Sequence, residues 1–216
     1  MKYDEKIQSL KEIFESPGEV LKRELALYRT HSGKELADEI AATNPSLVLD
    51  LGCGSNIFKK LIPNLIGIDI ADVGDVDIIG DINSLPTMFQ GQCADWILCF
   101  GPLNYGEDDW VNSICSVMKY LLKPKGTIVC HTSPLEFNTR PFSKIDWTDE
   151  TINRFGMIHN FKSTQQVTGY TDTFFMTDEH LKLQKQQSHR PVVKEGLESG
   201  DRMIVPLHVW RWKNDT

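Results

Sequence analysis

The 216-residue sequence lacks the features that mark several large classes of protein. It has no apolar run near the roughly 18 residues that a membrane-spanning helix needs. It has no excess of basic residues, since 23 Lys and Arg stand against 30 Asp and Glu and the formal net charge is −7. It also has no internal repeat and no low-complexity tract. These absences argue against a helical membrane protein and a repeat protein, and against a nucleic-acid partner, which would need a broad basic face.

The sequence also has no Cys-x-x-Cys pair, although it contains five cysteines. An odd number of cysteines without paired spacing is typical of a reducing compartment and predicts no disulfide framework. The N-terminus is charged and amphipathic and does not resemble a secretory signal. We therefore expect a cytoplasmic protein without a bound metal, and the composition leaves the oligomeric state open.

What the sequence does contain is a buried strand that runs into a glycine turn. The apolar stretch Leu47–Leu51 is followed directly by Gly52 and Gly54, and Asp50 precedes the turn. Glycine lets the backbone adopt left-handed conformations and approach a ligand closely, because it carries no Cβ. A glycine-rich turn after the first strand is the place where α/β folds bind nucleotides.

A second apolar strand, Leu65–Ile70, carries Asp69 near its end. This residue lies 17 positions after Gly52. An acidic residue about 20 positions past such a turn is placed to accept hydrogen bonds from ribose hydroxyls. The two strands together predict a site for a cofactor that contains a nucleoside.

The rest of the chain predicts a doubly wound α/β fold. Short apolar segments alternate with helical patterns from residue 45 to 131, and this alternation requires parallel βαβ units. Near the C-terminus, strands at 192–197 and 203–212 are only about five residues apart, so they must pair as an antiparallel hairpin. We expect a mostly parallel seven-stranded sheet with helices on both faces and an antiparallel terminal hairpin. The expected strands are 47–51, 65–70, 77–79, 94–100, 127–131, 192–197 and 203–212, with a turn at 123–126 and helices at 56–61, 108–122 and 177–187.

We expect one domain with four regions: a helical cover at 1–44, a cofactor-binding core at 45–134, an aromatic-rich insertion at 135–190 and the hairpin at 191–216. The helical cover either packs on one sheet face or acts as a lid that turns Tyr28, Arg29 and His31 toward the ligand. The insertion is either a substrate cover or a small additional core. The sequence pattern leaves both pairs of alternatives open.

Five segments, in order and at characteristic spacing, resemble the motifs of the class I Rossmann-like S-adenosylmethionine-dependent methyltransferase family. They are LDLGCGSN (49–56), GIDI (67–70), GDINSLP (80–86), ADWILCFGPLNY (94–105) and LLKPKGTIV (121–129). The final hairpin is similar to that family's antiparallel seventh strand. The resemblance implies S-adenosyl-L-methionine as the cofactor and methyl transfer as the reaction.

The resemblance also implies roles for individual residues. The implied cofactor-binding residues are Asp50 at the methionine amino group, Gly52, Cys53 and Gly54 in the turn, Asp69 and Ile70 at the ribose, Asp81 and the Ile82 backbone at the adenine, and Phe100 and Gly101 at the sulfonium end. One departure is Asn56, where many members carry a third glycine. Asn tolerates the left-handed backbone conformation, so this departure is compatible with the motif.

The acceptor is predicted less directly than the cofactor. We expect a small-molecule acceptor first and a protein acceptor second, because the segment after strand four lacks the second proline of the amino-directed nucleic-acid methylases. The first candidate for a catalytic base is His131, followed by Tyr105, Asn104 and His159. The alternative for His131 is a structural role, which is the usual role of a lone histidine.

Three other functions fit parts of the pattern. The protein could bind S-adenosylmethionine without catalysis, as a sensor or scaffold. It could transfer an aminopropyl group or cleave the cofactor on the same fold. A nicotinamide-dependent oxidoreductase is disfavoured, because its glycine fingerprint places a small residue where this chain has Ile57.

Overall fold

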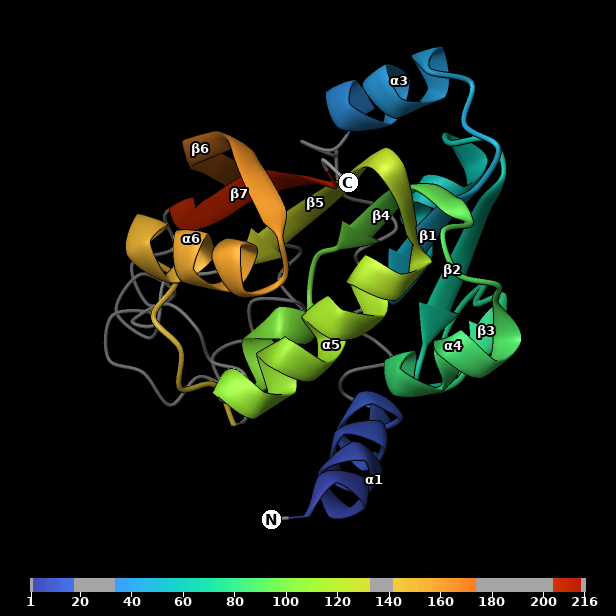
Figure 1. Ribbon diagram of the computed structural model, residues 1–216. Helices are drawn as coiled ribbons and strands as arrows, with labels where there is room; N and C mark the ends of the chain where they lie inside the picture. Colours follow the sequence, from blue (N-terminus) through green and yellow to red (C-terminus); the bar gives the residue numbers. More distant parts are fainter. Residues whose placement is uncertain (1, 18–33, 133–141, 174–203, 215–216) are drawn as a thin grey trace.

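The computed structural model describes residues 2–17, 34–132, 142–173 and 204–214 (Figure 1). Its seven strands are β1 (Val48–Leu51), β2 (Leu65–Asp69), β3 (Ile78–Ile79), β4 (Ala94–Cys99), β5 (Leu122–Thr132), β6 (Phe161–Thr173) and β7 (Ile204–Asn214). The α-helices described are α1 (Tyr3–Phe14), α3 (Lys34–Ala42), α4 (Leu85–Met88), α5 (Asp108–Leu121) and α6 (Asp149–Ile158). Short 3-10 helices are η1 (Ile57–Lys60), η2 (Ile82–Ser84) and η3 (Pro102–Tyr105).

The strands form one sheet in the order β3-β2-β1-β4-β5-β7-β6. Strands β1 to β5 pair in parallel, and β7 pairs antiparallel with both of its neighbours, β5 and β6. The predicted fold class is therefore confirmed: a mostly parallel, doubly wound seven-stranded sheet that ends in an antiparallel pair.

The expected composition of that terminal pair was wrong. The partner of β7 is β6, which the sequence pattern did not reveal as a strand, and the expected strand at 192–197 lies outside the described residues. The pattern of β6, FKSTQQVTGYTDT, carries few apolar residues, so period-two alternation is absent. The predicted turn at 123–126 is also corrected: these residues belong to β5, where Lys125 takes a left-handed conformation with φ of 63°.

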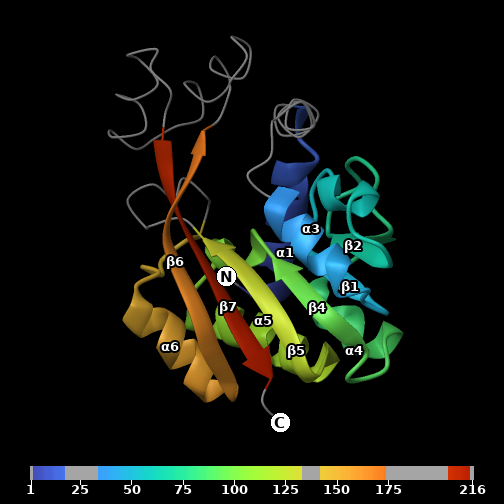
Figure 2. The same ribbon diagram turned by 90° about the horizontal axis from the view of Figure 1, so that it is seen from above.

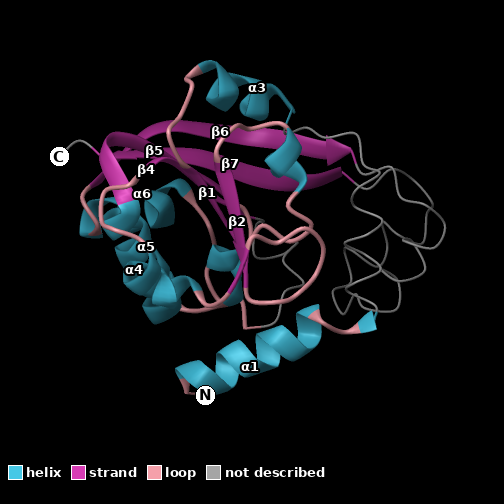
Figure 3. Ribbon diagram, turned by 90° about the vertical axis from the view of Figure 1, so that its right-hand side faces the viewer, coloured by secondary structure: helices cyan, strands magenta, loops and turns pink. Residues whose placement is uncertain are grey.

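The sheet is covered on both faces, as expected. Figures 2 and 3 show α3 on one face and α4, α5 and α6 on the other. Side chains alternate along a strand, so Leu49 and Leu51 pack toward α5 while Val48 packs toward α3. The two faces thus bury separate apolar clusters, and the strands read as continuous apolar runs because both faces are covered.

Three aromatic residues of the insertion, Trp147, Phe155 and Phe161, form part of the core. The ring of Trp147 stacks on Trp210 of β7, with centroids 5.1 Å apart, and also contacts Phe155 of α6. Phe161 stacks on Trp212 at 5.4 Å. All five side chains are buried. The described part of the insertion therefore supports the additional-core alternative, and the predicted helix at 177–187 lies outside the described residues.

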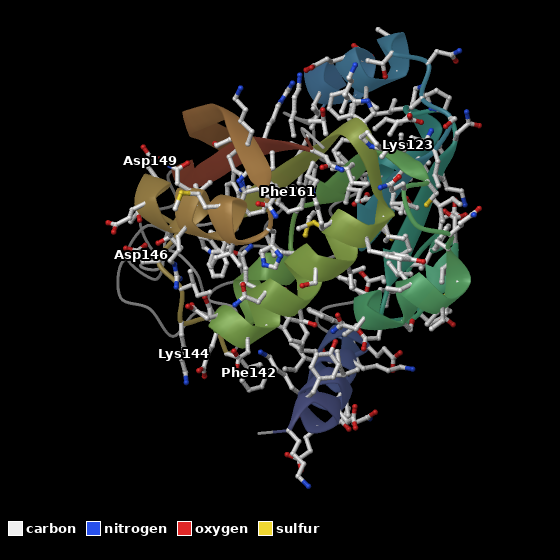
Figure 4. All side chains as sticks on the ribbon, in the orientation of Figure 1. Lys123, Phe142, Lys144, Asp146, Asp149 and Phe161 are labelled. Carbon is white, nitrogen blue, oxygen red and sulfur yellow. The ribbon has the colours of Figure 1, made fainter. Side chains whose placement is uncertain are left out.

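A polar network fixes the opposite end of the sheet from α1. The Asp95 carboxylate accepts hydrogen bonds from the Ser46 N–H and hydroxyl and the Leu47 N–H, and it pairs with Lys123 at 2.9 Å (Figure 4). Burial by itself raises the pKa of Asp95, but these bonds outweigh it and lower the pKa to about 2.

We expect Asp95→Asn to destabilise the protein by about 1 kcal/mol at neutral pH, because the partly exposed ion pair is lost and one oxygen remains as acceptor. A lowered pKa stabilises the fold above the unfolded-state value, so the difference from the native protein should shrink as the pH falls from about 4 toward 2. Urea unfolding across this pH range measures it, with Asp38→Asn on the exposed side of α3 as the control. A pH-independent difference would contradict the assigned network.

Candidate cofactor site at the carboxyl ends of the strands

The strand order reverses direction between β1 and β4, and the loops that follow these two strands meet there. A Cβ added to Gly52, in the loop after β1, would lie 2.6 Å from Cγ of Pro102, in the loop after β4. Open α/β sheets bind ligands at such a switch point, beyond the carboxyl ends of the strands. The structure thus brings the first and fourth motifs together at the place where a ligand is expected.

The glycine turn has the predicted backbone conformation. Gly52 and Gly54 have φ of +71° and +57°. The amides of Gly52 and Cys53 both donate to the Ile68 carbonyl, at 2.8 and 3.0 Å, and the Gly54 amide donates to Asp69 at 2.9 Å. These three N–H groups are engaged within the protein, so the turn offers a ligand close approach rather than those donors.

Asp69 connects the two motifs. One carboxylate oxygen accepts from the Gly54 amide and the other from the Ala71 amide at 3.1 Å, and the residue is 5% exposed. This arrangement gives Asp69 a structural role in addition to its predicted role as a ribose ligand. Each carboxylate oxygen has two lone pairs, so the structural role is compatible with the predicted one.

Asp50 lies on the α3 side of the sheet, on the strand next to Asp69. It is 3% exposed. Burial raises the pKa of Asp50 to about 7, with a further contribution from the nearby Asp69 charge. A buried carboxylate without a cation is costly, so this position favours a positively charged ligand group.

Asn56 has a structural reason for replacing the family's third glycine. It has φ of 49°, and its side chain packs on Gly67, where a Cβ would lie 2.4 Å from Nδ2. Its amide donates to the Asp75 carbonyl at 2.6 Å and to Asp77 at 3.1 Å, and Asp77 also binds Lys59. The departure therefore ties the turn to the loop before β3.

Asp81 begins η2 and caps it by accepting from the Asn83 amide at 3.0 Å. Both of its oxygens also accept from the hydroxyl of Tyr3, at 2.8 and 3.0 Å. The sequence analysis missed Tyr3, although Tyr3, Ile7, Leu10 and Phe14 share helical spacing. Tyr3 is the first residue of this apolar stripe, and its hydroxyl reaches the site.

Phe100 directly follows β4, and His131 lies near the end of β5. Both residues are on the α3 side of the sheet. Their rings meet edge to face at 5.9 Å, and Phe58 contacts Phe100 at 5.7 Å. Asn104 donates to the His131 carbonyl at 3.4 Å, and Tyr105 contacts Phe14 of α1. The structure thus groups these candidates at the carboxyl ends of β4 and β5, with Tyr105 in contact with α1.

One candidate base lies elsewhere. His159 follows α6 next to the start of β6, bonds Asn112 at 3.0 Å and stacks on Phe161. The start of β6 pairs with Asn214, at the amino end of β5, whereas the glycine turn lies at the carboxyl end of β1, so His159 lies at the opposite end of the strands from the turn. The expectation of His159 as a base was therefore wrong. Tyr28, Arg29 and His31 lie outside the described residues.

Among the described residues, no cluster of three or more His, Cys, Asp or Glu side chains could hold a metal ion. Among the same residues, no helix combines the length and the apolar composition that crossing a membrane demands.

No protein-family model matches the chain, and no curated protein matches its sequence. Solved structures do match. One is the Burkholderia thailandensis 1,6-didemethyltoxoflavin-N1-methyltransferase with 1,6-didemethyltoxoflavin and S-adenosylhomocysteine bound, with a TM-score of 0.68, 12% identity and coverage of 100% of this chain and 92% of that one. Another is a methyltransferase dependent on S-adenosylmethionine from Archaeoglobus fulgidus, with a TM-score of 0.61, 16% identity and coverage of 98% and 100%.

A third match is the [4+2]-cyclase SpnF, with a TM-score of 0.62, 12% identity and coverage of 96% of this chain and 95% of that one. Similarity at these identities concerns the fold, and the same fold supports more than one reaction. The strand order, the antiparallel β7 and these structures agree: the chain has the fold of the class I Rossmann-like S-adenosylmethionine-dependent methyltransferases.

Proposed function

We propose that the protein is an S-adenosylmethionine-dependent methyltransferase that acts on a small-molecule acceptor. The observation that carries this proposal is the buried Asp50 carboxyl beside the glycine turn, at the switch point of the sheet. Such a carboxyl is stabilised by a cationic group, and the amino group of the cofactor's methionine portion is one.

The chain's own residues fit the other parts of the cofactor. Asp69, held by two backbone amides at the end of β2, would accept from the ribose hydroxyls. Asp81 would accept from the adenine amine, and the backbone of Ile82 would meet the ring edge. Cys53 and Ile70 would line the methionine and ribose portions. Phe100 and Gly101 would surround the sulfonium end.

When bound, S-adenosylmethionine supplies a methyl group that its sulfonium activates toward nucleophiles. The protein's contribution is then to position the acceptor and exclude water. The rings of Phe58, Phe100 and His131 form an aromatic wall beside the turn. His131 is the residue we propose as the base for an acceptor that must lose a proton, with Tyr105 second.

A second candidate is cofactor binding without methyl transfer. The match to the [4+2]-cyclase supports this second candidate, because that protein has a similar fold and is named for a reaction other than methyl transfer. The nicotinamide-dependent alternative remains disfavoured, since Ile57 packs against the apolar cluster on the α3 side.

Isothermal titration with S-adenosylmethionine, S-adenosylhomocysteine and NADH tests the proposal. We expect micromolar binding of the first two and none of NADH. We also expect affinity to fall as the pH drops below about 7, because protonated Asp50 no longer attracts the cofactor's ammonium. Absence of binding by both sulfur compounds would contradict the proposed function.

A second experiment separates the two acceptor classes. We expect a labelled methyl group to be transferred to metabolite fractions but not to proteins, and no transfer to either would favour the binding-only candidate.

A further inference from the structure

Helix α1 lies across the carboxyl ends of the strands, at the end of the molecule toward which β2 points (Figures 1 and 3). Its first residue, Tyr3, bonds Asp81 after β3, and its last residue, Phe14, contacts Tyr105 after β4. Between them, Leu10 is 1% exposed, although it belongs to neither of the two apolar clusters of the sheet. Helix α1 therefore packs against the segments that follow β3 and β4 and not on a face of the sheet.

The N-terminal end of α1 is held by more than one contact. The Tyr3 ring stacks on Trp110 of α5, with centroids 5.6 Å apart, and the Lys6 ammonium lies 4.2 Å from the centre of the same indole ring. Lys6 also lies 5.7 Å from the ring of Phe142 (Figure 4). Asn83 donates to the Tyr3 hydroxyl and accepts from Ser113 of α5 at 2.7 Å. These contacts fix the position of the Tyr3 hydroxyl relative to Asp81.

The hydrogen-bonding capacity of Asp81 leaves room for a ligand. A carboxylate has about four lone-pair positions. The Tyr3 hydroxyl occupies one on each oxygen, and the Asn83 amide occupies a second one on Oδ1. One position on Oδ2 remains, which matches the single hydrogen that an adenine amine would donate. Burial and the Asp81 contact raise the pKa of the Tyr3 hydroxyl, so it stays a donor at neutral pH.

We infer that Tyr3 is a positioning residue: it orients the Asp81 carboxylate toward the adenine amine and holds α1 closed over the adenine end of the bound cofactor. This inference rests on the proposed function. It assigns cofactor retention to a residue outside all five sequence motifs. It also predicts that Tyr3 and Asp81 act as one unit, so removal of either should have most of the effect of removing both.

The test measures the release of S-adenosylhomocysteine by stopped-flow displacement, together with its equilibrium affinity. The variants are Tyr3→Phe, Asp81→Asn and the double variant. Tyr120→Phe, which makes the same change on a half-exposed ring of α5, is the control. We expect Tyr3→Phe to speed release about fivefold to tenfold, as for the loss of one hydrogen bond of ordinary strength, because Tyr3 acts on the cofactor only through Asp81. We expect the change to have little further effect in the Asp81→Asn background, and Tyr120→Phe to behave as the native protein.

A second ligand distinguishes the proposed positioning role of Tyr3 from a purely structural role. This ligand is S-inosylhomocysteine, in which an oxygen replaces the adenine amine. We expect Tyr3→Phe to reduce the preference for the adenine compound several-fold, because Asp81 is no longer oriented. General loosening of the site would weaken both ligands equally and would overturn the inference. Unchanged release in Tyr3→Phe would overturn it too, and tighter binding would show that Tyr3 competes with the cofactor. If the native protein itself binds no S-adenosylhomocysteine, the proposed function fails, and this inference fails with it.

Discussion

The Asp50→Asn variant is expected to be more stable than the native protein at pH 8 and, at the same time, to bind S-adenosylmethionine about 10- to 100-fold more weakly. The affinity loss follows from removing the anion that would pair with the cofactor's amino group, because a hydrogen bond between charged groups contributes about 1.5 to 3 kcal/mol. The gain in stability follows from removing a buried carboxyl whose pKa is raised by burial and by the nearby Asp69 charge.

The sign of the stability change depends on pH. The pKa of Asp50 rises from 3.8 to about 7 on folding, so the folded state binds the proton more tightly than the unfolded state. The native protein should therefore lose stability as the pH rises from about 4 to 7, by roughly 2 to 4 kcal/mol in total. Asp50→Asn lacks this loss, so the two proteins should be similar near pH 4 and differ fully above pH 7.

Chemical unfolding from pH 4 to 8 measures this difference, and titration with S-adenosylhomocysteine at pH 8 measures the affinity. Asp95→Asn serves as the matched control, because the same substitution at an ion-paired, partly exposed carboxylate should lower stability at neutral pH. A destabilised Asp50→Asn variant would show that Asp50 already has a compensating partner. Native affinity in a folded Asp50→Asn variant would remove Asp50 from the proposed cofactor site.

The second large effect is expected at Gly52. We expect Gly52→Ala to destabilise the protein by about 2 to 5 kcal/mol and to abolish cofactor binding. About 1 to 2 kcal/mol comes from forcing a side chain into the conformation with φ of +71°. The rest comes from the new Cβ, which would lie 2.6 Å from Cγ and 2.8 Å from Cδ of Pro102 and would push the loops after β1 and β4 apart.

Two further variants separate these causes. Gly80→Ala is the control, because a Cβ there meets nothing closer than 3.8 Å. Adding Pro102→Ala to Gly52→Ala removes the two clashing atoms, so part of the lost stability should return while the backbone strain remains. Thermal or urea unfolding of the set measures both contributions. If Gly52→Ala is as stable as Gly80→Ala and binds S-adenosylhomocysteine normally, the close contact between the two loops does not control the site.

Local sequence patterns predicted the parallel half of the molecule well. Strands β1, β2 and β4 are short and mostly apolar, and each ends at or within two residues of a glycine or an aspartate, so their type and their carboxyl ends could be recognised without the fold. The turn geometry of Gly52 and Gly54 follows from the same local information, since only glycine adopts it readily.

The features that sequence analysis missed depend on contacts between distant residues. Strand β6 is polar along much of its length, and its pairing with β7 is what makes it a strand. Tyr3 reaches Asp81 across 78 positions of the chain. The structural role of Asp69 and its proximity to the buried Asp50 likewise appear only when two neighbouring strands are placed side by side. Periodicity and motif spacing carry no information about such partners.

The place of β7 in the sheet has a consequence for how the chain folds during its synthesis. Strand β7 lies between β5 and β6, which do not pair with each other, and its residues are made after both. Until residues 204–214 leave the ribosome, β5 presents an open edge and the buried partners of Trp210 and Trp212 have no cover. The parallel half, with its glycine turn, can form early, whereas the antiparallel half assembles in one late step that depends on the strand in its middle. A ribosome that stalls before this strand would leave a nascent chain with a nearly formed cofactor site and an unpaired strand at the sheet edge. Chaperones bind intermediates of this kind.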